Sequence, residues 1–261
     1  MSTRTAVLGV LAGVALLALP AVIGTAAAGA APAPAPSPTG TPGVSVNIDG
    51  VDGEPSTSLV ILLGITALSV APALLLLTTS FTKILVVLSL TRNALGLPST
   101  PPNQVLAGLA LFLSLFIMGP VMSQVNDAGI QPFLSGDMTQ SQAIEAGSEP
   151  LREFMLGHTR SEDLALMTRS AGNENPTSPD TVPMTTLIPA FVLSELRAAF
   201  IIGFVIFVPF LVIDLVIAAI LMSMGMMMLP PVTISLPFKL LLFVLIDGWA
   251  QIITALVGSY S

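Results

Sequence analysis

One acidic residue, Asp214, lies inside a long apolar segment and is the side chain best placed to do chemistry. Residues 198–229 form a run of 32 residues in which Asp214 carries the one charge. A carboxylate at the centre of a membrane helix costs about 2.5–3.5 kcal/mol to insert. Such a group either forms an ion pair or carries a proton or an ion. The sequence offers Lys239 and Arg197 as cations, and we favour a structural ion pair over transport.

The spacing of Asp214 and Lys239 fits an ion pair if the chain reverses after Leu229. Asp214 is 15 residues before this point and Lys239 is 10 residues after it. Their depths would then differ by about 8 Å, most of which a lysine side chain can span. Glu195 lies 34 residues before the turn. Contact between Glu195 and Lys239 would need a bent helix or a neighbouring copy; the alternative is a Glu195 charge at headgroup level.

Methionines gather just before the predicted turn. Five of them fall within seven positions, at Met222, Met224, Met226, Met227 and Met228. Successive helical residues point about 100° apart, so three consecutive methionines cannot share one packing face. Because Pro230 and Pro231 follow, we expect the methionines at the tip of a turn. Several such tips around an axis would form a soft apolar constriction; the alternative is a lipid-facing surface.

Most other kinds of site are absent from the sequence. The chain has no cysteine and one histidine, His158, so neither a thiolate site nor a histidine cluster can hold a metal. It contains no G-x-x-x-x-G-K-[ST] loop and no H-E-x-x-H motif. A net charge of −7 without a basic stripe argues against nucleic acid as a partner. We therefore expect no catalytic residues, no cofactor and no metal.

Composition indicates an integral membrane protein. Hydrophobic residues make up 53% of the chain and charged residues 9%, whereas soluble domains carry about 25% charged residues. As one helix the run 198–229 would measure about 48 Å, against a hydrocarbon core of about 30 Å. It must therefore tilt, break at Pro209 or project beyond the lipid. The predicted fold class is an all-α membrane protein built from hydrophobic helical hairpins.

The N-terminal region has the features of a secretory signal followed by a linker. Arg4 precedes an apolar stretch, and small residues suitable for cleavage follow at Ala28 and Ala30. We predict a signal peptide over residues 1–30, with an uncleaved first span as the alternative. Residues 31–57 are rich in Pro and Ala, a composition that predicts a disordered linker.

Three further regions are expected after the linker. Residues 58–124 form a first hydrophobic helical hairpin, residues 125–185 a small helical insertion, and residues 186–261 a second hairpin with the methionine turn. Lys83 and Arg92 are expected in a short loop. The positive-inside rule makes that loop cytoplasmic and the insertion extracytoplasmic.

Two helices are expected within the insertion. Pro150 suits the first turn of one of them. Thr159 and Glu162 have the spacing of a capping box for the other.

The apolar segments also carry a resemblance to a known family. The residues concerned are 193–200, 209–216, 225–231, 236–240 and 244–249, with further matches at 82–84, 92–96, Thr159–Arg160 and Asp163–Leu164. Over roughly 59–261 the chain resembles the FliP family, which is shared between flagellar biosynthesis and type III secretion export gates.

This resemblance implies a non-enzymatic gate subunit in the bacterial inner membrane, at the flagellar basal body. Family members assemble as several copies with FliQ and FliR into a helical, ring-like structure, much of it above the membrane plane. Partners are then copies of the same chain, FliQ, FliR, other flagellar export-apparatus proteins, membrane lipid and unfolded flagellar proteins in transit. An injectisome subunit and, less favoured, an ion-coupled transporter using Asp214 remain alternatives.

The resemblance also suggests roles for particular residues. Met226, Met227 and Met228 match the methionine loop that acts as a pore gasket in the family. We further expect Arg160, Glu195, Asp214 and Lys239 to form ion pairs within one copy or between adjacent copies.

Overall fold

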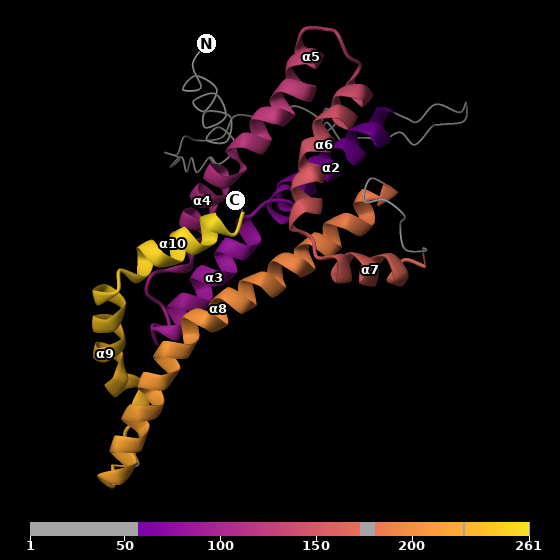
Figure 1. Cartoon of the computed structure of the whole chain (residues 1–261). Helices are drawn as coiled ribbons and strands as arrows, with labels where there is room; N and C mark the ends of the chain where they lie inside the picture. The colour runs from indigo at the N-terminus through magenta and orange to yellow at the C-terminus, as the bar shows by residue number, and fades with distance from the viewer. Residues whose placement is uncertain (1–56, 173–180, 227, 261) are drawn as a thin grey trace, which may run out of the picture. The chain divides into compact units, whose positions relative to one another are not determined.

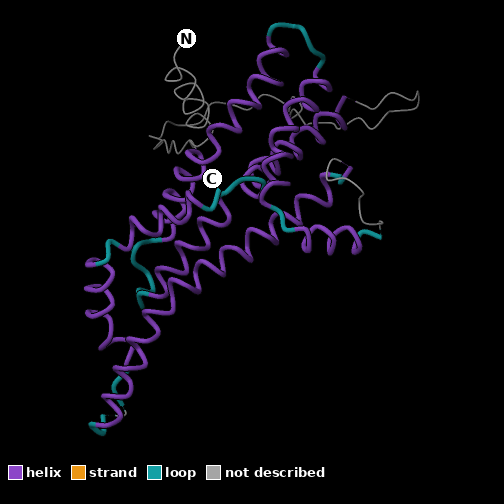
Figure 2. Tube along the Cα trace, viewed as in Figure 1, coloured by secondary structure: helices purple, strands orange, loops and turns teal. Residues whose placement is uncertain are grey.

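The computed structural model describes residues 57–172, 181–226 and 228–260, and every regular element in them is helical (Figure 2). In chain order the elements are α2 (Thr57–Leu77), α3 (Phe81–Ala94), α4 (Asn103–Val125), the π-helical η1 (Asn126–Ile130), α5 (Gln131–Leu134), α6 (Gln140–His158), α7 (Ser161–Ser170), α8 (Met184–Ser223), α9 (Pro231–Leu245) and α10 (Gly248–Gly258). The all-α membrane fold is confirmed. The predicted signal peptide and linker lie outside the described residues, except for Thr57 at the start of α2.

Helix α8 is the longest element and runs unbroken through its prolines. It has 40 residues with Pro189 and Pro209 inside it, which makes it about 60 Å long. The expected alternative of a break at Pro209 is therefore wrong. Since α8 is about twice as long as the hydrocarbon core is thick, it must tilt strongly or extend beyond the lipid.

Two helical stretches in the described part of the chain are each long and apolar enough to cross a membrane. They are Asn103–Leu134, which joins α4, η1 and α5, and α8. Two further pairs qualify only if each is counted as one broken span: α2 with α3, bent by 63°, and α9 with α10, bent by 62°. The hydrophobic helix of the first hairpin thus continues to Leu134, beyond the predicted boundary at 124.

Helix α3 packs along both α4 and α8 and is central to the main apolar core (Figure 1). Its buried residues include Ile84, Val87, Leu88 and Thr91, a spacing that places them on one helical face. Burying side chains of this size stabilises the fold by about 1.5–3 kcal/mol each. Where α3 meets α8, Gly203 leaves room for Leu90.

Lys83 is not a loop residue as the sequence suggested. It lies in the first turn of α3 and is 3% exposed. The short apolar stretch around Lys83 had suggested a loop because it is too brief to cross a membrane, but α3 is a core helix. Because Lys83 is not in the loop, the prediction that this loop is cytoplasmic depends on Arg92 alone, which lies in the last turn of α3.

The two helices of the insertion begin at other residues than expected. Pro150 lies in the middle of α6, which begins at Gln140 with a Thr139–Gln142 capping box. The α7 helix begins at Ser161, and Thr159 donates its hydroxyl back to the Met155 carbonyl at 2.7 Å. Thr159 therefore belongs to the end of α6, and its predicted capping box with Glu162 is wrong. A small core of Met155, Val182, Leu187 and Phe191 joins the insertion to α8.

Candidate functional site

Asp214 and Lys239 form a close ion pair between α8 and α9. The Lys239 ammonium donates to the Asp214 carboxylate at 2.6 Å, and the Ser235 hydroxyl donates to the other oxygen. Ser235 and Lys239 are four residues apart on α9, so both point toward α8. The Lys239 side chain is 2% exposed and that of Asp214 20%. Both oxygens of this carboxylate are therefore engaged within the chain.

Lys239 also reaches a third helix. Its ammonium donates to the carbonyl of Ala94, the last residue of α3, at 3.2 Å. The last carbonyls of a helix have no partners within the helix and lie at its negative end. A lysine ammonium both completes a hydrogen bond there and offsets the negative charge. Lys239 thus links α9, α8 and the end of α3.

A second buried ion pair joins Glu195 on α8 to Lys83 on α3. The distance between Lys83 Nζ and Glu195 Oε1 is 3.1 Å. Tyr260, beyond the end of α10, donates its hydroxyl to Glu195 Oε2. The Lys83 ammonium lies 3.7 Å from the centroid of the Tyr260 ring. Burial, together with the negative charge of Glu195, raises the pKa of the Tyr260 hydroxyl, which favours its role as a donor.

A third group of charges fixes the insertion to α8. Arg197 pairs with Asp163 at 3.2 Å and with Glu162 at 3.5 Å. The Ser194 hydroxyl donates to Asp163 at 2.8 Å and accepts the backbone N–H of Arg160 at 3.1 Å. These contacts hold the start of α7 against α8.

The structure brings together only two of the four residues expected in ion pairs. Asp214 pairs with Lys239, as considered from their spacing, whereas Glu195 pairs with Lys83. The side chain of Arg160 makes no ion pair with any residue that the structure describes. Sequence reasoning missed Lys83, and a lysine directly followed by an apolar run was the signal that could have identified it.

Met224, Met226 and Met228 lie at the turn between α8 and α9, as the Pro-Pro pair predicted, whereas Met222 lies in the last turn of α8. The α8 helix ends at Ser223, and Gly225 takes a left-handed φ of +75°, a conformation that glycine adopts readily. Met226 returns a backbone hydrogen bond to Leu221 at 2.9 Å, which completes the helix end. Met228 is 97% exposed and Met226 37%. Met227 lies outside the described residues.

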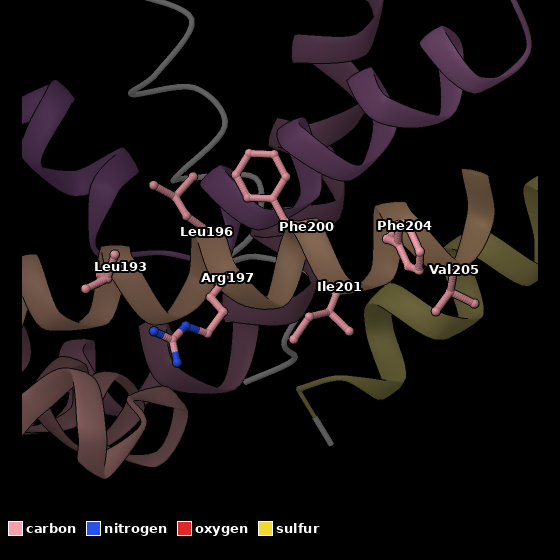
Figure 3. Close-up of a pocket in the computed structure, with 7 residues that line it drawn as sticks. All are labelled: Leu193, Leu196, Arg197, Phe200, Ile201, Phe204 and Val205. Atoms are coloured by element: carbon pink, nitrogen blue, oxygen red, sulfur yellow. The ribbon is translucent and has the colours of Figure 1, made fainter. Parts of the chain in front are cut away.

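Two hollows lie next to each other on α8. The larger, about 540 Å³, is lined by Leu193, Leu196, Arg197, Phe200, Ile201, Phe204 and Val205, all from one stretch of the helix (Figure 3). The smaller, about 400 Å³, is lined in part by Arg160, Glu195 and Ile201. Among the described residues no group of three or more His, Cys, Asp or Glu could hold a metal ion. The larger hollow is an apolar surface suited to another helix or to lipid.

Comparison with known proteins gives a consistent result over nearly the whole described region. The model of the FliP family matches residues 64–256. A flagellar biosynthetic protein FliP from Pectobacterium carotovorum is 52% identical over 84% of this chain and 88% of its own length. The relative of that name from Bacillus subtilis is 52% identical over 78% of this chain and 93% of its own. The relative of that name from Caulobacter vibrioides is 45% identical over 98% of this chain and 91% of its own length.

Proposed function

The chain belongs to the FliP family, and on this premise we propose that it is a subunit of the flagellar type III protein export gate. In this proposal several copies assemble with FliQ and FliR in the inner membrane at the flagellar basal body. Together they form the channel through which unfolded flagellar proteins are exported. The chain acts as a structural gate component and not as an enzyme.

The methionine turn is the observation that carries this proposal. It lies at the free end of the α8–α9 hairpin (Figure 1), where the Met228 side chain is almost fully exposed and that of Met226 is 37% exposed. Methionine adapts to irregular apolar neighbours. We assign Met226, Met227 and Met228 the role of a gasket that closes the channel when copies of the hairpin surround it.

The apolar surface of the long hairpin supports assembly with other helices. Exposed residues along α8 include Phe200, Phe204 and Leu215, which are 58%, 67% and 62% exposed. Contiguous apolar surface of this kind marks a protein or membrane contact. The ion pairs Lys83–Glu195 and Asp214–Lys239 hold the helices of each copy together, so that each copy can assemble as a rigid subunit. Because Ser235 and Lys239 occupy both oxygens of Asp214, these contacts favour a structural role for that acid over an ion-transport site.

A deletion in the bacterium that carries this chain tests the function. Loss of the chain should abolish secretion of the flagellar filament protein, and a plasmid copy should restore it. The control is an unrelated secreted protein of the general export pathway, whose release should not change. Normal filament-protein secretion without the chain would contradict the proposal.

A further inference from the structure

One charged residue of the second hairpin has no ion-pair partner among the described residues. Residues 184–260 contain five charged side chains, and four of them, Glu195, Arg197, Asp214 and Lys239, form the ion pairs described above. The fifth is Asp247, which is exposed at the corner between α9 and α10. This acid is notable because most of the residues around the corner are apolar, apart from Gln251, whose side chain donates to the Ile246 carbonyl.

The corner holds Asp247 firmly in place. Asp247 has a left-handed φ of 50°, a conformation that residues other than glycine adopt at a cost. The next residue must be glycine, because a Cβ on Gly248 would lie 2.2 Å from the Phe243 ring. That ring packs edge-on against Trp249 at 5.3 Å. The backbone at Asp247 is therefore set by close packing on the inside of the bend, and its carboxylate is presented outward.

Exposed apolar side chains precede this carboxylate on α9. Leu241, Val244 and Leu245 are 62%, 75% and 73% exposed. A surface that covers these residues also buries the carboxylate. Burying a charge is costly unless a cation meets it. The partner of this corner must therefore combine an apolar hollow with a positive charge.

The same chain carries such a surface on another element. The apolar hollow of about 540 Å³ on α8 adjoins the hollow that Arg160 helps to line, and Ile201 contributes to both. Arg160 is exposed and makes no ion pair with any described residue. Its backbone is fixed against α8 by the hydrogen bond to Ser194. An apolar hollow thus lies beside an arginine whose backbone is fixed and whose side chain pairs with no acid in the described part of the chain.

We propose that the α9–α10 corner of one copy docks on the α8 hollow of a second copy, with Asp247 pairing with Arg160 of that copy. This inference rests on the self-assembly in the proposed function and specifies which surfaces meet. The two surfaces belong to different elements, so each copy uses one surface toward one neighbour and the other surface toward the next. Contacts of this kind generate rings or helical assemblies. The second copy completes the pairing of both charges.

Cross-linking tests the contact directly, because the chain has no native cysteine. Tagged Asp247→Cys and Arg160→Cys chains are co-expressed and treated in mild detergent with a short bis-maleimide. We expect a cross-linked dimer that contains both tags, and little dimer from either variant expressed alone. The matched control pairs Asp247→Cys with Arg169→Cys, another exposed arginine of the insertion, and should give little dimer.

Three results would overturn the inference. One is an assembly of normal native mass that yields no dimer from the co-expressed pair. Another is cross-linking of Asp247→Cys to a different subunit. The third is full labelling of Asp247→Cys by a membrane-soluble maleimide within the assembly, which would show that lipid covers the corner. A chain that purifies only as a monomer would instead contradict the proposed function itself.

Charge reversal gives an independent readout. Asp247→Arg or Arg160→Asp alone places like charges together and should lower the recovered assembly roughly tenfold. The double variant, with both charges reversed, should recover most of it, while Arg169→Asp should have little effect. If both single reversals assemble like the unmodified chain, Asp247 and Arg160 do not meet.

Discussion

Lys83 and Glu195, 112 residues apart in the sequence, form an ion pair of 3.1 Å in which both side chains are almost fully buried. This contact joins α3 of the first hydrophobic region to α8 of the second. Because Tyr260 donates to the same carboxylate, the chain end is tied to the same point. One buried acid therefore connects three segments that are distant in the sequence.

Replacing Lys83 by methionine should strongly destabilise the protein. The change keeps most of the side-chain volume but leaves Glu195 buried without a cation, which costs about 3–5 kcal/mol. Thermal unfolding of the purified protein in detergent measures the loss.

The matched controls separate charge from packing. Arg169→Met removes an exposed cation and should change stability little. The double variant Lys83→Met with Glu195→Gln should recover part of the lost stability, since no buried charge remains. Equal stability of Lys83→Met and the unmodified protein would show that the pair contributes nothing.

Replacing Lys239 by methionine should loosen α9. Asp214 would keep only its Ser235 hydrogen bond, and the Ala94 carbonyl at the end of α3 would lose its donor. We expect the free energy of unfolding to fall by about 3–5 kcal/mol, as for Lys83. The loss should be smaller in the double variant that also carries Asp214→Asn, because no buried carboxylate is then left unpaired. Hydrogen exchange of α9 amides reports the loosening. Unchanged protection of α9 in Lys239→Met would contradict this interpretation.

Two glycine substitutions test the packing of α3 against α8. A Cβ on Gly203 would lie 2.3 Å from Leu90 Cδ1 and 3.1 Å from Leu90 Cβ, so Gly203→Ala should destabilise by about 1–3 kcal/mol. Gly108 in α4 has nothing within 4 Å of such an atom. Gly108→Ala should instead stabilise its helix by about 0.5–1 kcal/mol. Melting temperatures of both variants provide the measurement, and a stabilised Gly203→Ala would show that the two helices are not in close contact.

The sequence predicted those features of the fold that depend on local pattern. The apolar runs identified the hydrophobic helices, and the Pro-Pro pair identified the turn between α8 and α9. Counting residues from the turn predicted that Lys239 could reach Asp214, because the two residues lie on the two arms of one hairpin. In each case the deciding residues are close in the sequence or related by a single turn.

Features that depend on long-range packing could not be predicted in this way. Lys83 looked like a loop charge, since nothing nearby shows that Glu195 will cover it. Pro150 looked like a helix start, but α6 extends before it because the capping box of Thr139 and Gln142 lies upstream of Pro150. Several helices of this protein contain internal prolines, as at Pro72, Pro120 and Pro209, where a local rule predicts a helix break.

Replacing Met226, Met227 and Met228 together by alanine should make the closed gate leak. Alanine lacks the long apolar side chain that fills an irregular constriction. Ion conductance of membranes that contain the assembled gate should rise several-fold. The matched control replaces Met222, which lies in the last turn of α8, by alanine. Conductance that stays at the unmodified level in the triple variant, with assembly intact, would exclude a gasket role.

The central claim is that the apolar helices pack against those of other copies around a shared channel. Purification in mild detergent followed by native mass determination tests it most directly. The account predicts a defined mass of several copies together with bound companion subunits of the export apparatus. A stable, lone monomer of the chain, without channel or companions, would contradict it.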